Sequence, residues 1–297
     1  KHFFFGVSAA VILAGFVVMG VQKGSGSGAL NYSLDFMGGT QTTVTFAEDY
    51  SIERLDAEVV PGIEDITGDA NVQVQKVAGG NQVIFKTRTL EVEEREALDS
   101  MLEENFELDD AYPITAETIS STISSEAQTD AVVAVAIATV CMLLYIWFRF
   151  KDIRFGASAV IALIHDVLVV LAFYAVTRVS VGSTFIACML TIVGYSINAT
   201  IVIFDRVREN MRSMTRKDDL QEMVNHSITQ TLSRSIFTSL TTFIMVTALY
   251  VFGVSSIREF ALPLMAGILC GTYSSVCITG ALWYVLRTKI KQKEEAK

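Results

Sequence analysis

The sequence predicts a membrane protein: an all-α bundle of six transmembrane helices, with an extracytoplasmic ferredoxin-like α+β domain between helices 1 and 2. Three observations predict this fold class. The 297 residues are 51% hydrophobic and only 19% charged. The apolar residues gather in runs close to the ~20 residues that cross the hydrocarbon core of a bilayer. A long acidic segment separates the first run from the others.

Six apolar runs supply the predicted membrane helices. They cover residues 3–21, 131–148, 155–177, 179–204, 235–257 and 260–286. Runs of this length exclude a disordered chain, a fibrous chain and a small disulfide-stabilised secreted protein. The first run has no A-x-A-like cleavage site, so we expect a retained helix and not a signal peptide. The sequence lacks an initiator methionine, which favours a trimmed chain or the second half of a longer polypeptide.

Charge divides the chain into three predicted parts. Residues 22–128 hold 21 Asp or Glu against 6 Lys or Arg. We expect them to form one acidic domain between a helix at 1–21 and a five-helix bundle with a C-terminal tail at 129–297. The acidity is typical of a solvated surface; the alternative is a surface that contacts basic or unfolded polypeptide. A nucleic-acid partner is excluded, because it needs a basic stripe that this domain lacks.

Basic residues predict the orientation in the membrane. Most of the basic excess of the membrane part lies at 149–154, at 205–234 and in the tail from Arg287 onward. By the positive-inside rule these segments face the cytoplasm. Alternation of the spans then places both termini in the cytoplasm and residues 22–128 outside.

Periodicity within the acidic domain predicts a small α/β sandwich. Strands are expected at 43–46, 72–77 and 83–85, helices at 51–60 and 91–106, and a possible fourth strand near 108–115. The order strand, helix, strand, strand, helix, strand fits a ferredoxin-like domain.

Catalytic and cofactor motifs are missing from the sequence. It contains no G-x-x-x-x-G-K-[ST] loop, no G-x-G-x-x-G turn, no G-x-S-x-G elbow and no H-E-x-x-H pair. The three histidines are widely scattered and no two cysteines have C-x-x-C spacing, so no metal site is expected. All four cysteines lie in apolar runs, where we expect core packing. We therefore predict no enzyme activity and no cofactor, and any work must draw on an ion gradient or a partner.

Asp166 is the most informative polar residue within the predicted spans. It follows Phe155 by eleven residues, which places it ~16 Å into its helix and near the bilayer centre. Intramembrane carboxyl groups are costly and tend to line an interior path. Asp166 is thus either a proton-binding or helix-coupling group, or an acid held neutral by Ser, Thr or Asn neighbours. His165 points roughly 100° away on a helix, so it need not form a dyad with Asp166.

A second polar group is predicted on the fourth and fifth spans. Tyr195, Ser196 and Asn198 interrupt the fourth apolar run, and Arg234 opens the fifth. Residue counts put Asn198 and Arg234 at similar depth, so they could meet in the bundle. The alternatives are hydrogen-bonded helix contacts and an arginine that extends to the lipid headgroups. In the sixth span, Gly267 and Gly271 permit close helix contact.

An ordered set of short motifs resembles one family. The motif residues are Asp35, Gly38, Gly39 and Thr40 after the first span, Arg149 closing the second, His165 and Asp166 in the third, Gly194, Tyr195, Ser196 and Asn198 with Asp205 and Arg206 in the fourth, and Arg234 in the fifth. Together they resemble the SecF family of protein-export membrane proteins, free-standing or as the second half of a fused SecDF chain. The resemblance runs from residue 3 to residue 287.

The resemblance implies a function and a set of partners. It implies a member of the resistance-nodulation-division superfamily in the plasma membrane. Such a protein works with SecD and the SecYEG channel and uses the proton motive force, or a sodium gradient, to assist preprotein translocation. The implied partners are SecD, SecYEG, the translocating preprotein and the lipid bilayer.

One residue departs from the family pattern. The fourth span commonly carries Asp after Ser-Ile/Leu-Asn, where that Asp is implicated in proton conduction, and this chain has Ala199. Alanine cannot bind a proton. Three interpretations stay open: an engineered variant, a lineage that couples differently, for example through Asp166, and a chain that acts structurally. Arg234 matches the family's functional arginine, but its expected carboxylate partner is missing.

These observations lead to one hypothesis and two rivals. The leading hypothesis is an accessory subunit of the Sec translocase. The first rival is a resistance-nodulation-division half-transporter for lipids or small amphiphiles, which would normally need two large outer loops and twelve spans in one chain. The second rival is a non-conducting assembly subunit, favoured by Ala199. The candidate coupling residues in all of these are Asp166, Asn198, Ala199 and Arg234.

Overall fold

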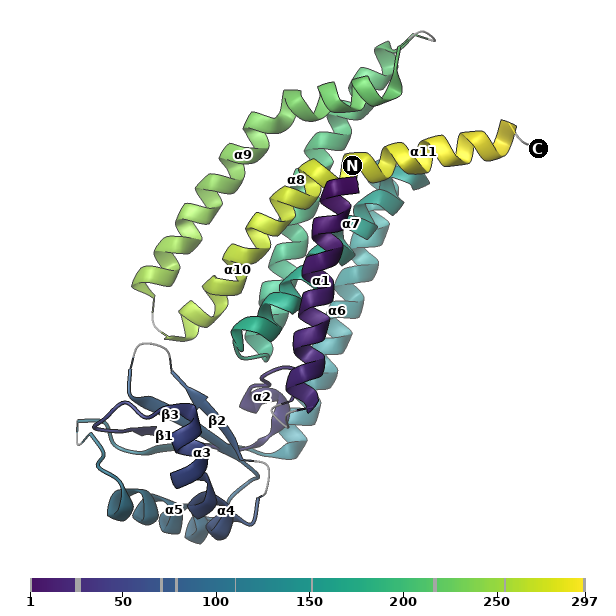
Figure 1. The fold of residues 1–297 in the computed structure, drawn as a ribbon. Coiled ribbons are helices and arrows are strands. Elements are labelled where there is room, and N and C mark those ends of the chain that lie inside the picture. Colours follow the sequence, from purple (N-terminus) through teal and green to yellow (C-terminus); the bar gives the residue numbers. More distant parts are fainter. Residues whose placement is uncertain are drawn as a thin grey trace. The chain divides into compact units, whose positions relative to one another are not determined.

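The structure is a computed structural model (Figure 1) that describes residues 2–24, 28–69, 72–77, 80–109, 111–150, 152–215, 218–253 and 255–295. The chain divides into two compact units. The membrane unit comprises Lys1–Asn31 and Val132–Lys297, and the α+β unit comprises Tyr32–Ala131.

Six helices of the described chain are long and apolar enough to cross a membrane, which confirms the predicted number of spans. Their bounds are α1 His2–Gly24, α6 Ser121–Phe150, α7 Ile153–Thr177, α8 Ser183–Ser213, α9 Leu220–Phe252 and the sixth, α10 Ser255–Tyr273, which continues as η1 Ser274–Thr279 and α11 Gly280–Glu295.

Helices α8 and α9 extend well beyond their apolar runs into polar sequence. α8 continues to Ser213, and α9 begins at Leu220, where the Asp219 side chain accepts a hydrogen bond from the Gln221 amide and caps the helix. Arg234 therefore lies inside α9 and not at its first turn, and the apolar run that follows it is only the second part of this helix. Hydropathy detects only the apolar part of a helix, so it could not detect these polar extensions.

Small residues bring α8 and α10 close together, as predicted. A Cβ at Gly267 would lie 2.3 Å from Ile192 Cδ1, and a Cβ at Gly271 would lie 3.1 Å from Ser196 Cβ. Around these contacts, Ile192 and Ile268 belong to an apolar cluster that also includes residues of α7 and α9. A second cluster surrounds Trp283, whose ring stacks on that of Phe155 at 4.9 Å between centroids.

The sixth span contains a π-helical turn. Residues Ser274–Thr279 form η1, and beyond it α11 leaves in a different direction from α10 (Figure 1). π turns commonly mark kinks and functional positions in helices. Here the turn buries the hydroxyl side chains of Ser274, Ser275 and Thr279 in the bundle.

Large apolar side chains remain exposed on α6 and α9. Val132, Ile137 and Trp147 of α6 are exposed, as are Phe237 and Met245 of α9. On a membrane helix such a face meets lipid or another membrane helix. The predicted packing role of the cysteines holds for the buried Cys188 and is wrong for Cys141, which is exposed on α6.

The α+β unit is a four-stranded antiparallel sheet with helices on one face (Figure 1). Its elements are α2 Leu34–Met37, β1 Gly39–Thr45, α3 Ile52–Glu58, α4 Val60–Thr67, β2 Gln73–Lys76, β3 Gln82–Thr87, α5 Val92–Asn105 and β4 Thr115–Ile119. The sheet order is β2-β3-β1-β4. Val44 and Phe85 from the strands pack against Leu55, Ile63 and Leu98 from the helices.

The strands and helices of this unit differ in detail from those predicted. The fourth strand covers Thr115–Ile119 and not 108–115, where a single bridge joins Leu108 to Phe46. The predicted helix at 51–60 ends at Glu58, and α4 starts directly after it with Pro61 in its first turn. Proline has no amide hydrogen to donate, so it is tolerated at a new helix start and not in a helix interior.

Arg88 and the start of α5 carry the clearest charge interaction of this unit. The Arg88 guanidinium forms an ion pair with Glu94, and Glu94 also accepts a hydrogen bond from the Glu91 amide as part of a capping box. The hydrogen bond from Arg88 and, second, that from the Glu91 amide hold the pKa of Glu94 below its usual value.

The contact between α1 and α7 gives a direct test of packing in the membrane unit. A Cβ at Gly15 would lie 2.1 Å from Ala172 Cβ and 2.8 Å from Ala172 Cα, whereas a Cβ at Gly20 would have nothing within 4 Å. We expect Gly15→Ala to lower the free energy of unfolding in detergent by about 1–3 kcal/mol, because the two helices must separate. Gly20→Ala is the matched control and should be neutral or slightly stabilising. Equal stability of the two variants would contradict the α1–α7 contact.

Candidate functional site

Asp166 occupies the centre of the membrane unit, as its position in the apolar run predicts. On α7, Ala159, Ala162, Asp166 and Val170 are buried; their spacing of three and four residues forms one helix face. That face packs against α8 and α10. Asp166 is 0% exposed. A carboxyl group buried in this way needs hydrogen-bonding partners, since leaving it without them would be very costly.

Four side chains provide those partners. Ser196 Oγ of α8 and Ser274 Oγ of η1 both donate to Asp166 Oδ2, the latter at 2.8 Å. Cys270 Sγ of α10 lies 3.3 Å from Oδ1, and His165 Nδ1 lies 2.9 Å from the same oxygen. The carboxyl group therefore joins α7, α8, α10 and η1. We call Asp166 with these four partners the carboxyl centre.

His165 and Asp166 are in contact, a pairing that the sequence leaves open. Their Cα–Cβ bonds diverge on the helix, but the His165 ring nitrogen still reaches the neighbouring carboxylate. The His165 side chain is 10% exposed and its Nε2 atom is buried with no hydrogen-bond partner among the described residues. Its ring centroid lies 6.3 Å from that of Tyr273.

The carboxyl centre also contains a mixed set of metal-ligand types. One ligand atom each from His165, Asp166 and Cys270 lies within 4.8 Å of the others. The spacing of histidines alone or of cysteines alone does not indicate this set, because it combines two neighbours on α7 with a residue of α10.

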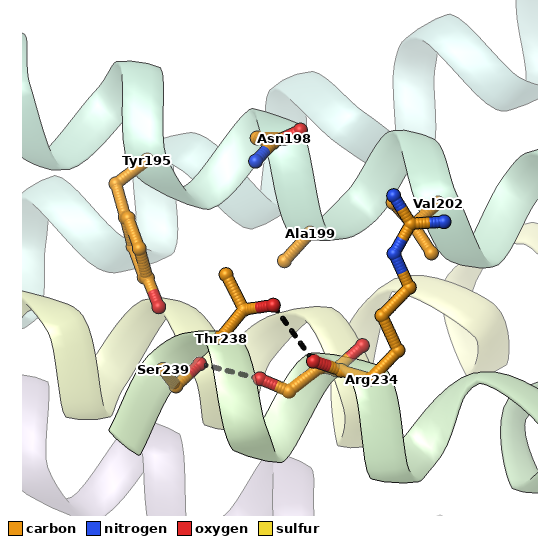
Figure 2. A pocket seen from close by; sticks show the side chains of 8 residues that line it. Tyr195, Asn198, Ala199, Val202, Arg234, Thr238 and Ser239 are labelled. Atoms are coloured by element: carbon orange, nitrogen blue, oxygen red, sulfur yellow. Dashed lines mark hydrogen bonds between the residues drawn. The ribbon is translucent and has the colours of Figure 1, made fainter. Parts of the chain in front are cut away.

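Between α8 and α9 lies a polar cavity of about 90 Å³, here called the arginine cavity. Its walls are Tyr195, Asn198, Ala199, Val202, Arg234, Ser235, Thr238 and Ser239. Figure 2 shows Tyr195, Asn198, Ala199 and Val202 on one helix facing Arg234, Thr238 and Ser239 on the other. Asn198 and Arg234, which the residue counts place at similar depth, thus line the same cavity.

Arg234 carries the only formal charge among the residues that line the arginine cavity. Its guanidinium extends toward Val202 (Figure 2) and forms no hydrogen bond or ion pair with any other described residue. Ala199 lines the same cavity and supplies only an apolar side chain. Thr238 Oγ1 donates to the Arg234 carbonyl oxygen and Ser239 Oγ to that of Ser235, so both hydroxyl hydrogens are already used.

Hydrogen bonds between hydroxyl groups join the sixth span to α8 and α9 near the two sites. Thr272 Oγ1 on α10 donates to Ser239 Oγ of the arginine cavity at 2.6 Å. On the other side of α8, Thr200 Oγ1 and Ser275 Oγ are 3.1 Å apart. Because α8 carries Ser196 on one face and Ala199 on another, both sites would be affected by a rotation or shift of this helix.

Asp205 and Arg206 stabilise the polar ends of the helices. Asp205 forms an ion pair with Arg149 at the end of α6. Arg206 Nε donates to Gln230 of α9 at 2.7 Å, and its Nη1 forms an ion pair with Glu209 at 2.6 Å. Both residues thus lie outside the carboxyl centre and the arginine cavity.

The Asp35–Thr40 motif belongs to the α+β unit and does not contribute to either site. Gly38 and Gly39 have positive φ angles of 69° and 112°, and a Cβ at Gly39 would lie 2.2 Å from the Thr87 carbonyl oxygen. Only glycine fits there. Buried Thr40 accepts a hydrogen bond from the Leu90 amide and contacts Thr118 Oγ1 at 3.1 Å. Asp35 lies in α2, before this turn. The motif therefore shapes the start of β1.

At Gly194, by contrast, no described residue lies close enough to require a glycine. Gly194 is exposed on α8 and a Cβ at this position would have nothing within 4 Å.

The fold and its sites define a polytopic membrane protein whose polar groups gather inside the helical bundle. Residues 99–289 match the family model described as protein export membrane protein SecD/SecF, C-terminal. The chain belongs to this SecD/SecF family of protein-export membrane proteins.

Individual relatives agree with this family. The chain is 35% identical, over 90% of its length, to protein translocase subunit SecF of Sebaldella termitidis and covers 85% of it. It is 36% identical, over 98% of its length, to protein translocase subunit SecDF of Thermus thermophilus and spans 39% of that protein. A crystal structure of T. thermophilus SecDF, described as translocon-associated, matches 96% of the chain with a TM-score of 0.79 at 34% identity, and the match covers 38% of that structure.

Proposed function

We propose that this chain is an accessory subunit of the Sec preprotein translocase, equivalent to SecF or the SecF half of SecDF. In this proposal it works with SecD beside the SecYEG channel in the plasma membrane. Both termini face the cytoplasm, and the α+β unit acts outside as a ferredoxin-like domain that contacts emerging preprotein. The observation that carries the proposal is the match of nearly the whole chain to SecF and SecDF proteins.

The distribution of exposed apolar surface supports a membrane partner. Only 6% of the apolar window of α6, 11% of that of α1 and 17% of that of α9 is buried inside this chain. The chain also spans about two fifths of the SecDF relatives. We therefore place SecD against these exposed helices, first of all against α6, which is the least buried.

Asp166 is the proposed ion-coupling group. A membrane-buried carboxyl that joins three helices can bias their packing when it gains or loses a proton, because each state favours different hydrogen bonds. Ala199 cannot do this. The carboxyl centre, and not position 199, would then respond to the proton or sodium motive force.

Ala199 favours a second candidate function, that of a non-conducting assembly subunit. In this alternative Asp166 only holds the helices together, and SecD or another subunit supplies coupling.

Copurification with SecD tests the leading proposal. The full chain, tagged and expressed with SecD and SecYEG, should retain SecD in a mild detergent. A chain with Val132→Arg and Ile137→Arg on the exposed face of α6 should lose SecD, because a charge at a helix–helix interface in lipid is costly. Loss of SecD from the unmodified chain would count against the proposal, and retention by both forms would remove α6 from the interface.

Ion flux distinguishes coupling from assembly. In proteoliposomes holding the chain with SecD, Asp166→Asn should lower proton or sodium flux at least about tenfold, because a positioned acid typically contributes ~10²-fold or more to proton transfer. Asp130→Asn, which removes an exposed carboxylate on α6, is the control and should leave flux unchanged. Ala199→Asp measures whether a second carboxylate adds flux. Normal flux and export with Asp166→Asn would favour the assembly role.

A further inference from the structure

The arginine cavity has the composition of an anion site. It has one positive charge from Arg234, and no carboxylate lines it. A cavity of about 90 Å³ has room for several waters or a small ion, since one water needs roughly 10–15 Å³ on the same measure. The Arg234 side chain is exposed at the edge of this cavity, and no carboxylate among the lining residues pairs with it, so an anion in the cavity would give it a counter-charge.

A second observation points to a ligand independently of Arg234. Ser235 lines the same cavity and is 6% exposed, and its Oγ has no hydrogen-bond partner among the described residues. A buried hydroxyl without a partner is uncommon, because its desolvation costs about 1–3 kcal/mol. The Ser235 hydroxyl is therefore free to donate to a ligand.

The other polar groups of the walls also suit an anion. Tyr195 offers a phenolic O–H and Asn198 an amide NH₂, and neither side chain has a hydrogen bond to another described residue. The hydroxyls of Thr238 and Ser239 donate to main-chain carbonyls and so do not compete. Arg234 has donors only, and the hydroxyls of Ser235 and Tyr195 and the amide NH₂ of Asn198 can each donate to an anion. A single positive charge balances one negative charge, which favours a monovalent ion over a divalent phosphate.

We propose that the arginine cavity binds one small monovalent inorganic anion, chloride under physiological conditions, held by Arg234 with Ser235, Tyr195 and Asn198. The space for it exists because residue 199 is alanine. This inference goes beyond the function proposed above and does not depend on it.

Chloride binding can be measured on the purified full chain in lipid nanodiscs. At constant ionic strength, replacing sodium gluconate with sodium chloride should raise the unfolding temperature saturably, by roughly 2 °C or more. The ³⁵Cl NMR signal should broaden on adding the chain. Arg234→Gln and Ala199→Asp should each lose the chloride-specific rise and the broadening, because one removes the charge and the other supplies a fixed carboxylate.

Arg206→Gln is the matched control, since it removes a cation from α8 that already has protein partners, and it should keep both effects. The chloride difference is measured within each variant, so a change in overall stability does not confuse it. Three results would overturn the proposal: no chloride-specific effect in the unmodified chain, an equal effect in Arg234→Gln, or a stabilisation that follows anionic lipid content and not chloride. The last would mean that Arg234 binds a headgroup.

Discussion

A carboxyl group buried in the middle of a membrane bundle must find its hydrogen-bond partners within the protein. Asp166 is completely buried, and its partners come from α8, α10 and the π-helical turn as well as from its own helix. Water in the bilayer core cannot replace them. The packing of these helices is thus tied to one side chain. The close approach of α8 at Gly267 and Gly271 is what brings Ser196 within reach of it.

The two polar sites differ in their chemistry although they share α8. The carboxyl centre is a negatively ionisable group surrounded by donors, with few groups left unsatisfied. The arginine cavity holds a positive charge and free donors. An aspartate at residue 199 would neutralise the charge of Arg234 within the arginine cavity. With alanine at this position, the acid (Asp166) and the cation (Arg234) lie in two separate sites. On this view the alanine changes where the negative charge of the bundle is held.

Much of this arrangement could be predicted from the sequence, because membrane spans and buried carboxylates have strong physical signals. Six apolar runs gave the six helices, and depth along the run placed Asp166 inside and Asn198 near Arg234. The partners of Asp166 that come from distant helices have no such signal. Ser274 and Cys270 resemble ordinary small residues in an apolar helix, and the π-helical turn brings Ser274 to the carboxylate.

Other differences have equally specific causes. The direction of the His165 Cβ does not indicate a contact with Asp166, because it leaves out the reach of the imidazole ring. The start of α9 lies in polar sequence, so hydropathy does not indicate it. The capping residue Asp219 is the sequence feature that marks this helix start. In the α+β unit, Thr115–Ile119 was missed because its exposed, polar residues do not alternate clearly with apolar ones. Its pairing with β1 is a long-range contact that local pattern does not encode.

The central claim is that Asp166 holds the bundle together through the sixth span. A double-mutant cycle with Asp166→Asn and Ser274→Ala, read from unfolding of the full chain in detergent, measures this directly. The control cycle pairs Asp166→Asn with Ser158→Ala, a buried serine on α7 whose hydroxyl donates to the Arg154 carbonyl oxygen. We predict a coupling free energy of about 1 kcal/mol or more for the first pair and none beyond error for the control. Additivity of the first pair within ~0.5 kcal/mol would contradict the claim.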